Sequence, residues 1–206
     1  MQKVDWNSWE RKEVFDFFFG LSQPFYCLTF RQDVTDLYRF TKENQLSFYY
    51  ALVYLCTKAM DRVEAFRYML QDGDLYLLDQ RIPSFRDLKP GSETFHIVTL
   101  PCGEDIKAFC RNAKEVSASQ TVFRNWTGSI KDHIFFSCVP WVELTAVSND
   151  RDFDPDDTIP RIAWGKYTEE NGRKMLNIGL ELNHRFIDGI HIGKFAETLT
   201  RMMAEL

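Results

Sequence analysis

The C-terminal part of the chain combines the two periodicities that most restrict what it can fold into. Apolar side chains alternate over residues 175–182, which predicts a β-strand, and they recur at helical spacing over residues 190–206. The connection between them reads Asn183-His184-Arg185-Phe186-Ile187-Asp188-Gly189. His184 is therefore predicted at the end of a strand and Asp188-Gly189 at the start of a helix, a place where rigid scaffolds often present reactive groups.

The rest of the chain shows helical spacing early and alternation mainly in the middle and towards the end. Helices are predicted at 9–19, 34–44, 48–70 (one helix or a pair) and 105–117, and strands at 25–33, 75–78, 93–99, 134–139, 142–147 and 162–167. Asn171-Gly172 is a turn signal that makes 162–167 and 175–182 a hairpin-like pair. This order predicts an α/β fold of the α+β kind, a two-layer sandwich, instead of a regular βαβ repeat. No linker or repeat interrupts it, so residues 1–206 are predicted to form one domain.

Composition excludes some functions and leaves others open. The 206 residues are 45% hydrophobic and 15% aromatic, with 18 Phe, so the aromatics either fill the core or line a pocket or a subunit interface. The net charge of -5 and the lack of a basic run give no support to a nucleic-acid partner. The acidic run 150–157 is interpreted as a solvated loop, because it lacks the glycine and glutamate of a calcium loop.

Cysteines and histidines further limit the chemistry. The five cysteines are widely spaced without a CxxC pair, and the N-terminus has no apolar leader, which predicts a reduced, cytoplasmic protein. No apolar run approaches the roughly 20 residues that span a membrane, so no membrane partner is expected. The four histidines have no metal-ligand spacing, so no metal is expected. By position alone, His184 is more often a structural histidine than a catalytic one.

Five motifs favour a catalytic role for His184 over a structural one. Asn183 to Gly189 matches HHxxxDG except for its first histidine, and Ser137-Cys138-Val139-Pro140-Trp141 matches SxxPW. The segment 9–18, with Trp9 and Arg11, and the tripeptides Glu93-Thr94-Phe95 and Gly165-Lys166-Tyr167 follow the same order. Together they cover nearly the whole chain, which resembles the chloramphenicol acetyltransferase family.

The resemblance implies a fold, an assembly and a reaction. The fold would be a CoA-dependent acyltransferase sandwich, with a mixed sheet and helices on one face. The assembly would be a homotrimer with active sites between subunits. The reaction would move acetyl from acetyl-CoA, as cosubstrate, to a hydroxyl of a small molecule such as chloramphenicol, which gives antibiotic resistance. It would use a ternary complex without an acyl-enzyme or a metal.

The resemblance also assigns catalytic and supporting residues. His184 corresponds to the general base, which accepts the proton of the attacking hydroxyl. Ser137 corresponds to the hydrogen-bond donor for the oxyanion. Asp188 corresponds to an aspartate that pairs with Arg11 and fixes the loop that carries the histidine, and Gly189 is expected to permit the turn.

Substrate contacts follow from the same comparison of motifs. The expected acceptor-binding residues are Phe17, Phe18, Tyr26, Phe95, Val147 and Asn149. Val147 and Asn149 replace larger apolar residues of the family, which makes that wall smaller and more polar. Lys166 and Tyr167 are expected to contact CoA. Ala163 stands where the family has a threonine whose hydroxyl helps to hold a water near the oxyanion.

Three alternatives to the chloramphenicol reaction remain open. The same mechanism can act on another hydroxylated acceptor. The chain can be a trimeric binding protein that has lost activity, which Ala163 favours and the retention of His184, Ser137, Asp188 and Arg11 opposes. A lipoyl-dependent acyltransferase core shares the His-Asp-Gly pattern, but it normally comes with lipoyl and linker segments.

Overall fold

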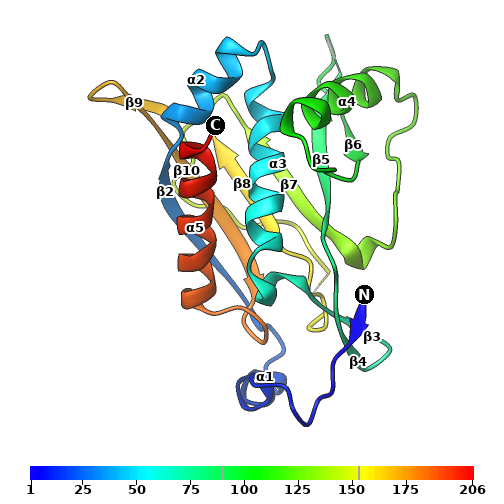
Figure 1. Ribbon diagram of the computed structural model, residues 1–206. Helices are drawn as coiled ribbons and strands as arrows, with labels where there is room; N and C mark the ends of the chain where they lie inside the picture. Colours follow the sequence, from blue (N-terminus) through cyan, green and yellow to red (C-terminus); the bar gives the residue numbers. More distant parts are fainter. Residues whose placement is uncertain (90, 153) are drawn as a thin grey trace.

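The computed structural model describes residues 1–89, 91–152 and 154–206, and its strands form two sheets (Figure 1). The larger sheet has seven strands in the order β2-β10-β8-β7-β5-β6, with β9 beside β10. Its strands are β2 (Phe25–Asp33), β5 (Ile82–Leu88), β6 (Phe95–Thr99), β7 (His133–Val139), β8 (Arg161–Gly165), β9 (Thr168–Glu170) and β10 (Arg173–Asn183). The smaller sheet, in the order β1-β4-β3, contains β1 (Gln2–Lys3), β3 (Tyr68–Gln71) and β4 (Asp74–Leu77).

The helices form the second layer. They are α1 (Lys12–Phe19), α2 (Thr35–Glu43), α3 (Phe48–Asp61), α4 (Ile106–Ser119) and α5 (Gly189–Ala204), with 3-10 turns at Glu64–Arg67 and Ile130–Asp132. In Figure 1, α2 to α5 lie in front of the large sheet, and α1 lies apart at its lower end. β5, β7 and β8 run parallel to one another and the other neighbours in the large sheet are antiparallel. The predicted two-layer α+β architecture, with a mixed sheet and helices on one face, is confirmed.

Alternation along β10 gives the large sheet two different faces. Leu176, Ile178, Leu180 and Leu182 are buried on the helix side. On the neighbouring strand, Phe30 is paired with Ile178 and packs against Phe195 of α5, which fixes this assignment. The intervening side chains point the other way, because successive residues of a strand alternate. We call the side that the helices do not cover the outer face.

Helix α3 lies at the centre of the helix layer and is buried almost all round. Ser47 begins it, with a side chain that accepts a hydrogen bond from the backbone of Tyr50. Apolar side chains on every side of the helix are buried, as expected for a helix packed between a sheet and two other helices. Each such side chain stabilises the fold by about 1.5–3 kcal/mol.

The predicted helix over 48–70 is too long. It ends at Asp61, and residues 68–70 instead belong to β3. The buried guanidinium of Arg81 explains the change, because its Nε donates to the Phe66 carbonyl and its Nη2 to the Tyr68 carbonyl, each at 2.7 Å. These two bonds hold residues 66–68 against the Arg81 side chain as the chain passes into β3.

The predicted strand over 142–147 is wrong. This segment has no regular secondary structure, and it packs on the outer face against β10. Asn177 donates through its side chain to the Leu144 carbonyl at 2.8 Å, and Val147 packs directly on Gly179. A Cβ at Gly179 would lie 2.5 Å from Val147, so the close approach requires glycine there. Apolar alternation in 142–147 therefore indicates packing on a sheet and not membership of one.

Besides β1 and β3 of the small sheet, two strands of the large sheet were not predicted. β5 contains Pro83, which breaks the usual strand pattern, yet it pairs with both β6 and β7. β9 is the true partner of β10 across the turn, where Asn171 and Gly172 have φ angles of 50° and 77°. The predicted pairing of 162–167 with 175–182 is still confirmed, because β8 is also antiparallel to β10. None of the described helices combines the length and the apolar character that a membrane span requires.

Candidate active site

His184 is the first residue beyond β10, as predicted. Its backbone N–H donates to the Pro24 carbonyl at 2.8 Å, which joins it to the start of β2. The imidazole stacks on Phe18, with ring centroids 4.2 Å apart, and lies 4.5 Å from the ring of Tyr26. The two aromatic rings fix the orientation of a side chain that stays partly exposed.

The expected ion pair between Arg11 and Asp188 is present beside this histidine. Arg11 Nη1 donates to Asp188 Oδ2 at 2.6 Å. Burial raises the pKa of Asp188, but the hydrogen bond and the charge of Arg11 outweigh it and hold that pKa below its usual value. The other oxygen, Oδ1, lies 3.1 Å from His184 Nε2. A carboxylate in this position stabilises the imidazolium that a general base becomes.

Gly189 does not have its expected role in the turn. It begins α5 without a left-handed φ, and a Cβ there would meet nothing within 4 Å. The loop is closed instead by His191, whose Nδ1 accepts a hydrogen bond from the Asp188 backbone at 2.9 Å. Burial, and then the charge of Arg11, lower the pKa of His191, which keeps Nδ1 unprotonated and able to accept.

The residues on either side of His184 are buried anchors that the sequence interpretation missed. Arg185 donates from Nη2 to the Phe19 carbonyl and from Nη1 to Asp156 Oδ1, both at 2.8 Å. Asn183 donates from Nδ2 to the Pro155 carbonyl at 2.8 Å. Their signal was weak, because nothing local in the sequence links positions 183–185 to 155–156. The peptide that carries His184 is thus fixed to α1 and to the acidic run.

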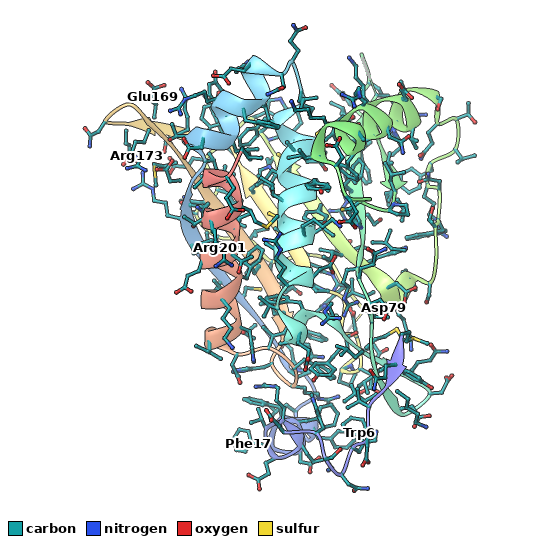
Figure 2. The ribbon with its side chains drawn as sticks, in the orientation of Figure 1. Trp6, Phe17, Asp79, Glu169, Arg173 and Arg201 are labelled. Carbon is teal, nitrogen blue, oxygen red and sulfur yellow. The ribbon has the colours of Figure 1, made fainter. Side chains whose placement is uncertain are left out.

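Phe17 lies close to the same histidine but faces solvent. Its ring centroid is 4.9 Å from that of Phe18, and its side chain is 77% exposed. Figure 2 labels it on α1, at the lower end of the molecule. An exposed aromatic ring in contact with Phe18 is free to contact a second chain or a ligand.

Ser137 and His184 do not meet within one chain. Ser137 lies on the outer face of β7 and is paired with Ala163 of β8, which in turn is paired with Gly179 of β10. His184 is five residues beyond Gly179. At about 3.3 Å per residue along a strand and about 4.8 Å between strands, the two side chains are roughly 15–20 Å apart. The expected base and the expected oxyanion donor therefore cannot act on one substrate inside a single chain.

The expected acceptor residues divide in the same way. Phe18 and Tyr26 contact His184, with Phe17 next to Phe18, whereas Phe95, Val147 and Asn149 belong to the outer face near Ser137. Phe95 lies on the edge strand β6. Asn149 is held by Glu181 of β10, whose Oε2 accepts from the Asn149 backbone at 2.7 Å.

The two expected CoA contacts follow the end of β8. Lys166 is exposed, and its backbone N–H donates to the Val142 carbonyl at 2.7 Å. The ring of Tyr167 packs against Tyr38 and Phe48, with centroids 5.5 and 5.9 Å away. The side chain of Lys166 is therefore accessible to a ligand. The ring of Tyr167 already packs against two aromatic rings on the helix side.

A cavity of about 730 Å³ lies on the outer face, and a second one of about 100 Å³ adjoins it and reaches Ser137. The acidic run 150–157 forms part of its wall. The expectation that this run is a solvated loop is wrong for Arg151 and Asp157, whose side chains are buried and joined by a 3.0 Å ion pair. Phe153 lies outside the described residues. Within the described residues, no cluster of His, Cys, Asp or Glu could hold a metal ion.

Comparison with known proteins gives a consistent result. The model of the chloramphenicol acetyltransferase family matches residues 1–200. A chloramphenicol acetyltransferase of Clostridium perfringens is 29% identical over 206 residues, covering 98% of both chains. Chloramphenicol acetyltransferase 3 of Escherichia coli is 26% identical over 203 residues, covering 97% of this chain and 95% of the relative.

Solved structures agree on the fold. A chloramphenicol acetyltransferase superposes with a TM-score of 0.86 at 22% identity, covering 98% of this chain and 99% of the other. The dihydrolipoamide acetyltransferase of Azotobacter vinelandii superposes with a TM-score of 0.66 at 16% identity, covering 94% and 86%. At these identities, the two superpositions establish a shared fold.

Proposed function

The chain belongs to the chloramphenicol acetyltransferase family of acetyltransferase enzymes, and from this premise we propose that it transfers acetyl from acetyl-CoA to a hydroxyl of a small molecule. The family uses acetyl-CoA as its cosubstrate. The proposal treats residues 1–206 as one catalytic domain. It places the reaction in the cytoplasm, which suits five unpaired cysteines.

The observation that carries the proposal is the environment of His184. A partly exposed imidazole is stacked on Phe18 and packs against Tyr26, and the ion pair of Arg11 and Asp188 lies beside it. A base held in one orientation next to a carboxylate is suited to accept a proton and to carry the resulting charge.

The proposed reaction has two steps. The acceptor hydroxyl attacks the thioester carbon and gives its proton to His184, so that a C–O bond forms and the carbonyl oxygen becomes an oxyanion. Ser137 donates a hydrogen bond to that oxyanion, an interaction worth about 2.7–4 kcal/mol in comparable sites. The C–S bond then breaks, and the leaving thiolate of CoA takes the proton back from His184. Lys166, exposed beyond β8, is the proposed contact for a CoA phosphate, with Tyr167 beside it.

A thiol-release assay tests this function. Acetyl-CoA is supplied with chloramphenicol and with a panel of hydroxylated compounds, and the free thiol of CoA is measured over time. Release is expected only when the acceptor carries a free hydroxyl, and the O-acetylated form of each acceptor is the control. Binding of CoA without release in any reaction would favour the alternative of a binding protein that has lost activity.

The separation of Ser137 from His184 also supports an assembly in which a second chain completes each site. We expect a homotrimer, because the family resemblance implies one and because the chain exposes large apolar side chains that an interface would cover. Phe17, Trp141 and Val142 are among these exposed side chains. Sedimentation equilibrium at micromolar concentration is expected to give three times the mass of one chain, and a monomer mass would contradict the proposal.

Replacing Ala163 with threonine is expected to leave activity unchanged or to raise it a few-fold. Ala163 is paired with Ser137 on the neighbouring strand, so a hydroxyl at position 163 would help to order a water near the oxyanion. The measurement is kcat with the preferred acceptor, together with the melting temperature. A large fall in kcat at unchanged stability would mean that Ala163 leaves room for a bulkier acceptor.

A further inference from the structure

The outer-face cavity is ionic along one wall and apolar along the other. Its apolar wall is formed by Ile97, Trp126, Ile130 and Phe135, and Arg124, whose guanidinium lies over the Trp126 ring at 5.0 Å, and Lys131 line the cavity as well. Its polar wall carries the guanidinium groups of Arg86, Arg151 and Arg161 together with the acidic run. Such a cavity does not suit a wholly neutral, apolar acceptor, because each charge that loses water must find a partner.

Most of these charges already have partners within the chain. Arg161 Nη2 lies 2.9 Å from Asp157 Oδ2, and its Nη1 donates to the Ile159 carbonyl at 3.2 Å. Arg151, only 2% exposed, lies 3.0 Å from Asp157 and 3.2 Å from Glu181. These groups form a buried network that holds the cavity wall in place.

Arg151 nevertheless has unused hydrogen-bonding capacity. Its Nη1 is buried without a hydrogen-bond partner among the residues that the structure describes. Its Nε is close to Glu181, but the angle is unsuitable for a hydrogen bond. The guanidinium instead packs over the ring of Phe25, 3.3 Å from its centroid, so Arg151 belongs to the support of the cavity and is not its open cation.

Of these three arginines, Arg86 has the weakest internal partner. Its Nη2 lies 3.6 Å from Asp150 Oδ1, beyond hydrogen-bond distance, and the side chain of Asp150 is 91% exposed. An exposed pair of this kind contributes little. The guanidinium also lies over the ring of Phe95 at 5.5 Å, which positions it without neutralising it.

Arg86 is also the charge nearest to the expected chemistry. The register that pairs Phe85 with Phe136 places Arg86 directly beside Ser137, on the outer face of the neighbouring strand. Both residues line the smaller pocket, together with Asn149. A group bound to Arg86 would thus lie within a few ångströms of the proposed oxyanion donor.

We propose that the acceptor is a hydroxylated carboxylic acid whose carboxylate binds Arg86. This inference rests on the proposed acetyl transfer. The acceptor carboxylate replaces Asp150 at Arg86, its apolar part packs on the wall that contains Trp126, and its hydroxyl reaches the site beside Ser137. A single negative charge fits better than a phosphate dianion, because the exposed Asp152 and Asp154 at the rim repel additional negative charge.

The test compares matched pairs of acceptors, each a hydroxylated acid and its neutral amide. Suitable pairs are 4-(hydroxymethyl)benzoate with 4-(hydroxymethyl)benzamide, and 3-phenyllactate and 3-hydroxybutyrate with their amides. For at least one pair, kcat/KM with acetyl-CoA is expected to be about 10 to 100 times higher for the acid, the size of one charge-assisted hydrogen bond. In Arg86→Gln that ratio is expected to fall to about one, mainly through KM, and Arg86→Lys should keep part of it.

Two further measurements make the outcomes separable. Arg111→Gln is the control variant: it also replaces an arginine with glutamine, but on the exposed face of α4. It should keep the preference for the acid over its amide. Calorimetry measures the binding of each acid and amide without any acetyl transfer. If no compound is acetylated but the acids bind better and Arg86→Gln removes the difference, the inference stands and the proposed function fails. If acceptors are acetylated but no acid is preferred over its amide in any pair, or Arg86→Gln leaves the preference intact, the inference is overturned.

Discussion

Replacing His184 with alanine is expected to lower kcat by two to four orders of magnitude, because general-base catalysis typically contributes about 10²–10⁴. Binding of CoA should remain nearly intact, because the base acts on the acceptor hydroxyl. The measurement is steady-state thiol release, with CoA binding followed by calorimetry. A variant that keeps more than about a tenth of the original kcat would contradict the assignment.

Added imidazole supplies a sharper control for this variant. His184 is stacked on Phe18 and packs against Tyr26, so its removal leaves a space beside two aromatic rings that suits a free imidazole. Rescue that saturates with imidazole concentration would show that the loss is chemical. A lower melting temperature without rescue would instead indicate that His184 mainly supports the fold.

Mixing two inactive variants is expected to restore activity. Ser137→Ala alone should lower kcat by about 10²–10³, the usual effect of losing one oxyanion donor. If each site takes His184 from one chain and Ser137 from its neighbour, a trimer that contains both His184→Ala and Ser137→Ala chains has an intact site at some of its interfaces. Random assembly of equal amounts should give about a quarter of the original activity, because one interface in four combines the two intact residues.

The control for this experiment is a chain that carries both substitutions, assembled with His184→Ala. None of its interfaces combines an intact serine with an intact histidine, so activity should stay low. Activity of the first mixture no higher than the mean of its two components would mean that the site is completed within one chain. That result would contradict the distance inferred from the strand register.

Periodicity predicted those elements whose burial is decided by their own side chains. β10, α5 and the first part of α3 show their apolar pattern directly, and the predicted strand at 25–33 matches β2. Prediction was wrong where distant residues decide the conformation. The end of α3 depends on Arg81, and the irregular course of 142–147 depends on Asn177 and Gly179 of another element.

The same distinction applies to the site. The neighbourhood of His184 could be assigned from short motifs, and the pairing of Arg11 with Asp188 is present in the structure. The ionic wall could not be assigned, because Arg86, Arg151 and Glu181 come from three separate segments and look like ordinary surface charges in the sequence. Only the sheet register brings Arg86 beside Ser137.

The anchors on both sides of His184 restrict how this enzyme can be re-engineered. Asn183 and Arg185 hold the acidic run through Pro155 and Asp156, so the wall that we propose selects the acceptor is tied directly to the peptide that carries His184. A loop graft of residues 150–157 from a relative, made to change acceptor choice, would release both anchors and disturb the position of His184. Such a graft needs the donor's residues at 183 and 185 as well, and acceptor range and turnover should change together when they are exchanged.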